Sequence, residues 1–147
     1  MDKIKWCCKQ KTGIRLVEPN DRLANKYIED EDSDFLQMKK ASGKWREIMA
    51  YYACYEALYA ILQKYGIKCE IHDRSIELIK FIEKLKIFRD FVTALKKERI
   101  NIQYYLKPPK GVDENKVSEF ILVCKETINE LNDDSIKEFR SEIEKYL

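Results

Sequence analysis

The chain has 147 residues, of which 45% are hydrophobic and 37% charged, with only four glycines and three prolines. This length suits one domain with a substantial core, and the apolar fraction is too high for a disordered chain. The formal net charge is only +2. The chain as a whole therefore has little attraction to nucleic acid, so we expect no DNA partner, and RNA binding would need a local basic patch.

The first residues, MDKIKWCCKQK, lack the apolar stretch that signal peptides carry, and no other run is long enough to cross a bilayer. We therefore expect a cytoplasmic protein with reduced thiols and no membrane partner. The five cysteines form no CxxC pair, and no nearby histidine completes a metal-ligand set with them, so the sequence predicts no metal site. Cys54 and Cys124 are expected to be buried on helices, and the pattern assigns no role to Cys7 and Cys8.

The N-terminal part divides into an irregular segment and a helix. Residues 1–19 show little periodicity and are expected to form an irregular lead-in, with Trp6 as its anchor. The sequence PND at positions 19–21 marks a helix start, because Asn or Asp caps a helix N-terminus, and the helix is expected to end near residue 40. The acidic run at 29–32 is expected to be a solvated face of this helix.

The segment 45–66 is the one around which the chain is organised. Its middle, residues 48–62, carries a single charged residue, Glu56, and every other position is apolar or tyrosine. A helix that faces water on one side shows a polar stripe, and this segment shows none. It is therefore predicted to be the central helix of a bundle, ended by Gly66 in the left-handed conformation.

Further helices are predicted downstream of a connecting loop at 67–73. They span 74–83 (capped by Asp73), 87–106, 113–131 and a last stretch after residue 134. No strand-like alternation of useful length and no internal repeat is present. The sequence thus predicts one all-α domain over residues 1–147, an antiparallel up-and-down bundle of about five helices.

One arginine stands out in the helix predicted at 87–106. On a helical wheel, Arg99 falls at the centre of the apolar stripe, whereas Lys96 and Lys97 lie away from it. The stripe consists of Phe88, Val92, Leu95, Ile102 and Leu106. Because a buried guanidinium must be paired, we predict that Arg99 approaches Glu56 of the central helix, directly or through a tyrosine.

Several polar residues surround this position. They are Asn101, Gln103, Tyr104 and Tyr105 beside Arg99, and Tyr52 and Tyr59 on the face of Glu56. Two interpretations stay open: a buried ion pair that fixes helix register, or a polar cleft in which Arg99 binds a phosphate or nucleotide. His72 is the only histidine, and its place before a predicted helix start is more typical of a loop or cap residue than of a catalyst.

Three segments resemble the HEPN family (higher eukaryotes and prokaryotes nucleotide-binding domains). MAYYACYEALYAILQKYGIKCEIHDRSIELI is similar to its second and third helices, and ERINIQYYL to its final helix segment of arginine, polar residue and tyrosine. The opening KWCCKQKTGIRLVEPNDRLANKYI is similar to the start of a small stand-alone prokaryotic branch. The resemblance covers nearly the whole chain.

The resemblance implies a helical bundle, usually a homodimer with a cleft at the interface. Many members are ribonucleases, often toxins, whose motif is an arginine followed a few residues later by a histidine. Arg99 matches the arginine and Asn101 could match the polar residue after it, but Tyr104, Tyr105 and Leu106 occupy the histidine window, and none of them is a comparable base at neutral pH.

The resemblance therefore favours a non-catalytic module without a cofactor, which binds a nucleotide or RNA around Arg99. A minimal nucleotidyltransferase is an expected partner, as in toxin–antitoxin systems. Two alternatives remain. One is a ribonuclease in which Tyr104 or His72 moves the proton, and the other is a purely structural dimer held in register by Arg99 and Glu56.

Overall fold

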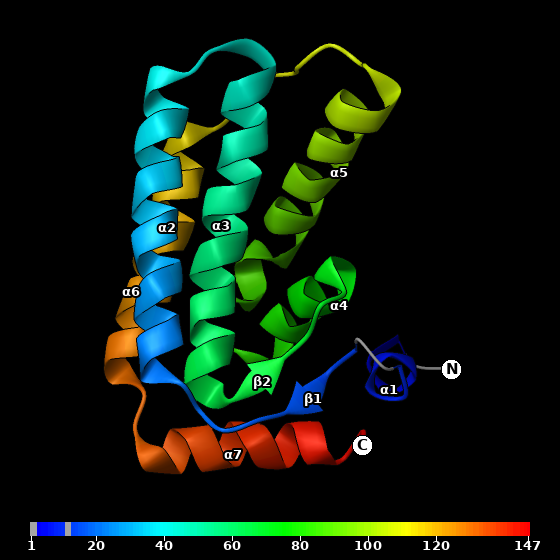
Figure 1. Ribbon diagram of the computed structural model, residues 1–147, viewed down its shortest axis with the longest axis vertical. Helices are drawn as coiled ribbons and strands as arrows, with labels where there is room; N and C mark the ends of the chain where they lie inside the picture. The colour runs from blue at the N-terminus through cyan, green and yellow to red at the C-terminus, as the bar shows by residue number, and fades with distance from the viewer. Residues whose placement is uncertain (1–2, 11–12) are drawn as a thin grey trace.

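A computed structural model describes residues 3–10 and 13–147. Within these residues the chain forms seven α-helices and one two-stranded ribbon. The four long helices that run up and down along the molecule are α2 (Asp21–Lys40), α3 (Gly43–Tyr65), α5 (Arg89–Tyr105) and α6 (Glu114–Glu130) (Figure 1). The predicted all-α bundle is confirmed. Its helix count is higher than predicted, and the helix that was not expected is α1 (Lys3–Cys8), in the segment predicted to be irregular; α4 (His72–Glu77) is the second short helix.

The helix α3 is the centre of the bundle, as predicted. It contacts α2, α4, α5, α6 and α7 (Asp133–Glu144), and every residue from 57 to 63 is buried. It ends at Gly66, whose φ of 78° lies in the left-handed region and whose N–H donates to the carbonyl of Gln63 at 3.1 Å. A Cβ at Gly66 would collide with the Val17 carbonyl and with Arg140, so both conformation and space require glycine.

The helix α2 begins where the sequence predicts, because the side chain of Asn20 accepts a hydrogen bond from the N–H of Leu23 at 2.9 Å. The prediction that its acidic run is a solvated face is wrong for Glu31. This side chain is completely buried and pairs with Lys125 of α6 at 3.4 Å. The acidic face of α2 is therefore partly covered by another helix.

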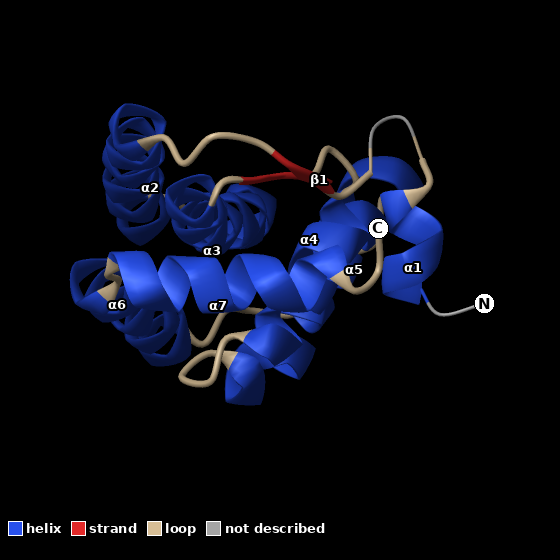
Figure 2. Ribbon diagram, turned by 90° about the horizontal axis from the view of Figure 1, so that it is seen from below, coloured by secondary structure: helices blue, strands red, loops and turns tan. Residues whose placement is uncertain are grey.

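The N-terminal segment is more ordered than the irregular lead-in expected for residues 1–19, of which 1–2 and 11–12 lie outside the described residues. Strand β1 (Arg15–Leu16) pairs antiparallel with β2 (Ile67–Lys68), in a register that places Arg15 opposite Lys68. Figure 2 shows this ribbon between the N-terminal end of α2 and α1. Trp6 does not anchor the segment: it is 41% exposed, whereas Ile4 and Cys7 are completely buried because α1 packs against α4.

The helix predicted at 74–83 is wrong in both start and length. The helix α4 begins at His72 with Ile71 at the cap position, so Asp73 lies in the first turn and does not cap it. A 3₁₀ turn, Leu78–Phe81, follows directly and a second, Lys86–Phe88, leads into α5. The first turn ends at Ile82, whose backbone is extended (φ −107°, ψ 105°), so the chain does not continue as one straight helix. Leu78, Ile79, Ile82 and Leu85 are all buried in the core.

The last helix, α7, lies across one end of the bundle (Figures 1 and 2). Asn132 and Ser135 form a reciprocal capping box at its start. Its inner face stacks Phe139 on Tyr65, with ring centres 3.9 Å apart. Next to this pair, Nη1 of Arg140 donates to the carbonyls of Val17, Tyr65 and Gly66 at 2.8, 3.0 and 2.9 Å. This arginine thus ties α7 to the end of α3 and to the segment before α2.

Candidate functional site

Tyrosines follow one face of α3, because residues three and four apart in a helix lie on the same side. The rings of Tyr51 and Tyr55 have centres 5.8 Å apart, and those of Tyr55 and Tyr59 are stacked at 5.7 Å. Tyr27 of α2 meets Tyr59 edge to face at 5.0 Å. We call the rings of Tyr27, Tyr51, Tyr55 and Tyr59 the tyrosine floor. It extends from the side of α5, at Tyr51, to the side of the β1–β2 ribbon, at Tyr59.

Arg99 of α5 lies over the upper end of this floor. Its guanidinium carbon is 4.9 Å from the centre of the Tyr51 ring and 5.5 Å from that of Tyr52, which are cation–π distances. Nη1 donates to the Tyr52 hydroxyl at 3.2 Å and to the Gln103 side-chain oxygen at 3.3 Å, while the buried Nε has no hydrogen-bond partner. Among the residues that the structure describes, no carboxylate lies within 4.0 Å of Arg99. Within the described part of the chain, this half-buried cation therefore has no counter-ion.

His72 lies beside the same tyrosines. The hydroxyl of Tyr51 is 2.8 Å from Nδ1 of His72, and the ring of Tyr55 stacks on the imidazole with centres 4.0 Å apart. Burial lowers the pKa of His72, and the positive charges of Arg99 and Lys96 lower it further. Because burial also raises the pKa of Tyr51, its hydroxyl keeps its proton and can donate it to Nδ1 of a neutral His72. The site therefore holds an uncharged imidazole at neutral pH.

Hydrogen bonds to α3 fix the segment that carries His72. The Tyr55 hydroxyl donates to Ser75 Oγ at 3.2 Å, and this Oγ lies 3.2 Å from the carbonyl of Cys69, to which it can donate. The Tyr59 hydroxyl accepts from the N–H of Cys69 at 3.2 Å. Consequently, the histidine is held by the tyrosine floor rather than by contacts within its own short helix.

The predicted approach of Arg99 to Glu56 is wrong. Within the described part of the chain no ion pair or hydrogen bond joins them, and Glu56 lies against Asp34, Asp30 and Glu31 of α2. Burial, the hydrogen bond with Asp34 and these neighbouring charges raise the pKa of Glu56 to about 9. Glu56 is therefore a protonated acid between α2 and α3 and does not belong to the site.

The other predicted residues divide into two groups. The structure brings Tyr52 and Gln103 to Arg99, in agreement with their choice as neighbours. Tyr104 is 68% exposed, and neither it nor the Asn101 side chain makes a hydrogen bond with Arg99 or His72 among the contacts of the described residues. The predicted burial of Leu106 is also wrong: it is 86% exposed with φ of 52°, because the chain leaves α5 there.

Sequence reasoning missed Tyr51, Tyr55 and Lys96. Lys96 was expected to extend into water, but its side chain is only 15% exposed and its Nζ lies 2.5 Å from Asp73 of α4. It precedes Arg99 by three residues and so shares a face with it, a signal present in the helical wheel. Tyr51 and Tyr55 belong to a series of tyrosines spaced four residues apart, and this spacing is visible in the sequence. Their contact with His72 is not, because it depends on how the chain turns after β2.

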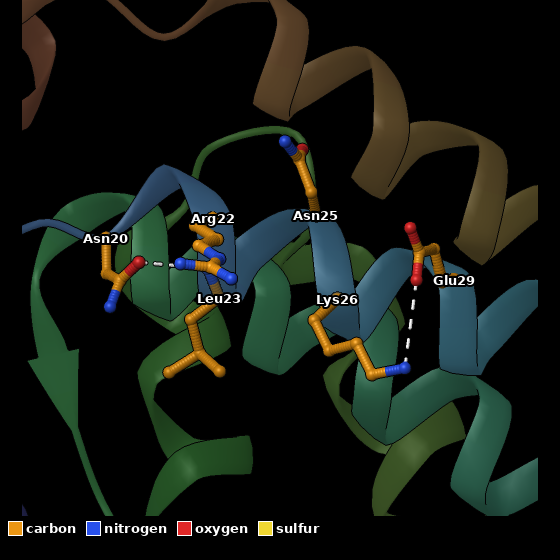
Figure 3. A pocket seen from close by; sticks show the side chains of 6 residues that line it. All are labelled: Asn20, Arg22, Leu23, Asn25, Lys26 and Glu29. Atoms are coloured by element: carbon orange, nitrogen blue, oxygen red, sulfur yellow. Dashed lines mark hydrogen bonds and ion pairs between the residues drawn. The ribbon is translucent and has the colours of Figure 1, made fainter.

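Several hollows lie near the tyrosine row and α2, among them one of about 470 Å³ bordered by Tyr27, Tyr59, Gln63 and Lys68, which does not reach His72. Another, of about 240 Å³, is lined by Tyr27, Tyr55, Tyr59, Cys69, Glu70 and His72. A wider one, of about 530 Å³, lies on the outer side of α2, where Lys26 is directed toward Glu29 at 3.8 Å and Asn20 caps the helix (Figure 3). Lys26, Glu29 and Asn20 in this hollow thus already have partners within α2. The hollow beside His72 is the better candidate for a ligand.

No family model, curated protein or solved structure matches this chain. Its relation to the HEPN family therefore stays a prediction. Among the described residues, no group of three or more His, Cys, Asp or Glu side chains is placed to hold a metal ion. No described helix is long and apolar enough to cross a membrane. Cys54 and Cys124 are completely buried, as predicted.

Proposed function

We propose that the protein is a non-catalytic, HEPN-type module that binds the phosphate group of a nucleotide or RNA at Arg99. The observation that supports this is the cation without a counter-ion: the guanidinium lies on two tyrosine rings, with no described carboxylate within 4.0 Å. A partly desolvated guanidinium gains most from an anion that accepts two parallel hydrogen bonds, as phosphate does. Lys96, on the same side of α5, is already paired with Asp73 at 2.5 Å, which leaves Arg99 as the cation of this face for an incoming anion.

The test is calorimetric titration of the protein with ribose 5-phosphate, nucleoside monophosphates and a short single-stranded RNA at low ionic strength. Arg99→Ala is expected to weaken binding about tenfold to a hundredfold, as for loss of a charge-assisted hydrogen bond. Lys97→Ala, in an exposed position of the same helix, is the matched control and should bind as the wild type does. Absence of binding to all these probes, or equal binding by Arg99→Ala, would contradict the proposal.

One observation favours a second candidate, cleavage of RNA. His72 contacts Tyr51, on whose ring Arg99 lies, so a neutral imidazole and a phosphate-binding cation share one aromatic support. In such a ribonuclease His72 would adopt the tautomer whose Nδ1–H donates to the Tyr51 hydroxyl, so that Nε2 takes the proton of the attacking hydroxyl as the new O–P bond forms. The leaving oxygen would depart with a proton as its bond to phosphorus breaks, and Arg99 would stabilise the charge on the phosphate oxygens. Tyr104 is too exposed to share this role. Cleavage of single-stranded RNA by the wild type, lost in both His72→Gln and Arg99→Ala, would favour it over the non-catalytic module, whereas equal residual cleavage in all three would indicate contamination.

The proposal includes two protein partners, a second copy of the chain and a minimal nucleotidyltransferase. The end of α5 presents an apolar surface suited to such contacts, with Tyr105 68% and Leu106 86% exposed. Light scattering after gel filtration should give a dimer mass that Leu106→Asp reduces to the monomer. Ile87→Asp, 76% exposed at the opposite end of α5, is the control. Co-purification with a co-expressed transferase tests the second partner.

A further inference from the structure

The hollow beside His72 has the form of a site for one planar ring system. Its volume of about 240 Å³ is enclosed mainly by rings, those of Tyr27, Tyr55, Tyr59 and His72. Tyr55 and Tyr59 are each only 8% exposed, while Tyr27 and His72 are partly exposed and so accessible for stacking. Aromatic and histidine rings are the side chains on which unpaired bases stack in proteins that bind single-stranded RNA.

The hollow has one charged lining residue, Glu70. Its side chain is 48% exposed, and Arg15 Nη2 and Lys68 Nζ each lie 3.8 Å from its carboxylate, beyond hydrogen-bond distance. No hydrogen bond among the described residues reaches this carboxylate. An ionised carboxylate accepts through two oxygens and donates nothing. The edge of the hollow therefore presents two carboxylate oxygens next to stacking rings. Each is ion-paired at 3.8 Å with one cation, Arg15 or Lys68, and neither accepts a hydrogen bond from the described residues.

We propose that this hollow binds guanine, with the base stacked against Tyr27 and His72 and its N1–H and 2-amino group donating to the Glu70 carboxylate. The inference rests on the proposed function, because the phosphate of the same nucleotide would lie at Arg99. The proposed base site and the proposed phosphate site are connected through two residues. His72 lines the hollow and is hydrogen-bonded to Tyr51, and the guanidinium of Arg99 lies on the ring of Tyr51. The protein would thus select guanine nucleotides or guanine-containing RNA.

The other bases fit a carboxylate less well. Guanine presents two neighbouring donors on its Watson–Crick edge, and so can fill both oxygens of Glu70. Adenine and cytosine each present one donor beside a ring nitrogen that is an acceptor, and uracil presents one donor between two carbonyl oxygens. A ring nitrogen or carbonyl oxygen that faces the carboxylate has no donor to pair with and is repelled by its negative charge. Such a mismatch discriminates strongly between guanine and the other bases.

Four probes separate the base from the phosphate: GMP, inosine monophosphate, AMP and ribose 5-phosphate, each titrated by calorimetry. GMP is expected to bind at least about tenfold more tightly than AMP, with inosine monophosphate between them because it lacks the 2-amino group. Glu70→Gln and Glu70→Asp should reduce the affinity for GMP to near that for AMP and leave ribose 5-phosphate binding unchanged. Glu119→Gln, exposed on α6, is the control and should keep the preference for GMP.

The outcomes distinguish this inference from the proposed function. Equal affinities for GMP and AMP, or a preference for GMP that survives in both Glu70 variants, would overturn the guanine site even if ribose 5-phosphate binds through Arg99. If ribose 5-phosphate does not bind but guanosine binds in preference to adenosine and depends on Glu70, the base site stands and the phosphate site at Arg99 is wrong.

Discussion

The carboxyl group of Glu56 on α3 lies within hydrogen-bond reach of the carboxylate of Asp34 on α2. Such a contact is stable only while one of the two groups carries a proton, because two charged carboxylates repel each other. Since the pKa of Glu56 is raised from 4.5 to about 9, this proton is present through the neutral range. The interface between α2 and α3 is thus sensitive to alkaline pH.

The first prediction concerns this proton. The folded state binds it and the unfolded state does not between pH 4.5 and about 9, so Glu56 makes the free energy of unfolding fall as pH rises through this window. Glu56→Gln removes this titration and should stabilise the protein at pH 9 by about 1 to 2 kcal/mol relative to its effect at pH 5. Urea unfolding at both pH values measures the difference. Glu126→Gln, exposed on α6, should leave the pH dependence as it is.

The second prediction concerns Glu31, whose pKa is raised to about 7, mainly by burial. Lys125→Met removes the cation that pairs with this carboxylate and should destabilise the protein by about 3 kcal/mol at pH 8. The loss should be smaller at pH 5, where Glu31 binds a proton in the folded state. Adding Glu31→Gln should recover part of the stability at pH 8. If the single variant lost the same stability at both pH values, the pairing with Glu31 would not be the cause.

A third prediction uses the single histidine as a probe of the site. Its imidazole signals in a proton NMR titration should report a pKa below the ordinary value of 6.5, because of burial and the charges of Arg99 and Lys96. Arg99→Gln should move the pKa of His72 upward, since a positive neighbour disfavours the imidazolium. Lys97→Gln, exposed on the same helix, should not move it. An unchanged pKa in Arg99→Gln would place the guanidinium away from His72.

The fourth prediction concerns Arg140, whose Nη1 donates to three carbonyls. Arg140→Ala leaves these acceptors with fewer partners and should lower the free energy of unfolding by about 2 to 3 kcal/mol. Arg140→Lys should recover only part of this, because all three bonds come from Nη1 and the lysine side chain is one bond too short to place its nitrogen there. Lys137→Ala, exposed on the same helix, is the control for loss of a positive charge and should cost less than about 0.5 kcal/mol.

The long helices could be predicted because their signals are local. Asn20 marks the start of α2 and Gly66 the end of α3, each through its own backbone or cap chemistry. The absence of a polar stripe in α3 correctly indicated a helix enclosed on all sides. In contrast, the short α4 and its 3₁₀ turns follow from how Leu78 and Leu85 reach the core, which depends on the finished packing.

The pairing of Arg99 could not be predicted in the same way. A helical wheel shows which face of α5 is apolar, but it does not show which face of α3 lies opposite. In the structure Tyr51 faces Arg99, and Glu56, five residues later, is rotated by about 140° toward α2. Similarly, the place of His72 depends on β2 pairing with β1 and on the hydrogen bonds of Ser75. The residue types suggested the chemistry of the site. Which residues lie together in it is determined by the tertiary fold.

The three bonds of Arg140 also constrain the order in which the chain can complete its structure during synthesis. Arg140 follows Val17 by 123 positions, so α2 and α3 leave the ribosome long before the group that closes their shared end. Until then the carbonyls of Val17 and Tyr65 lack this donor, whereas the carbonyl of Gly66 can already accept from the N–H of Val17 at 2.8 Å. A growing chain can pair its first long helices early, but the end of the bundle under α7 closes only after Arg140 has been synthesised.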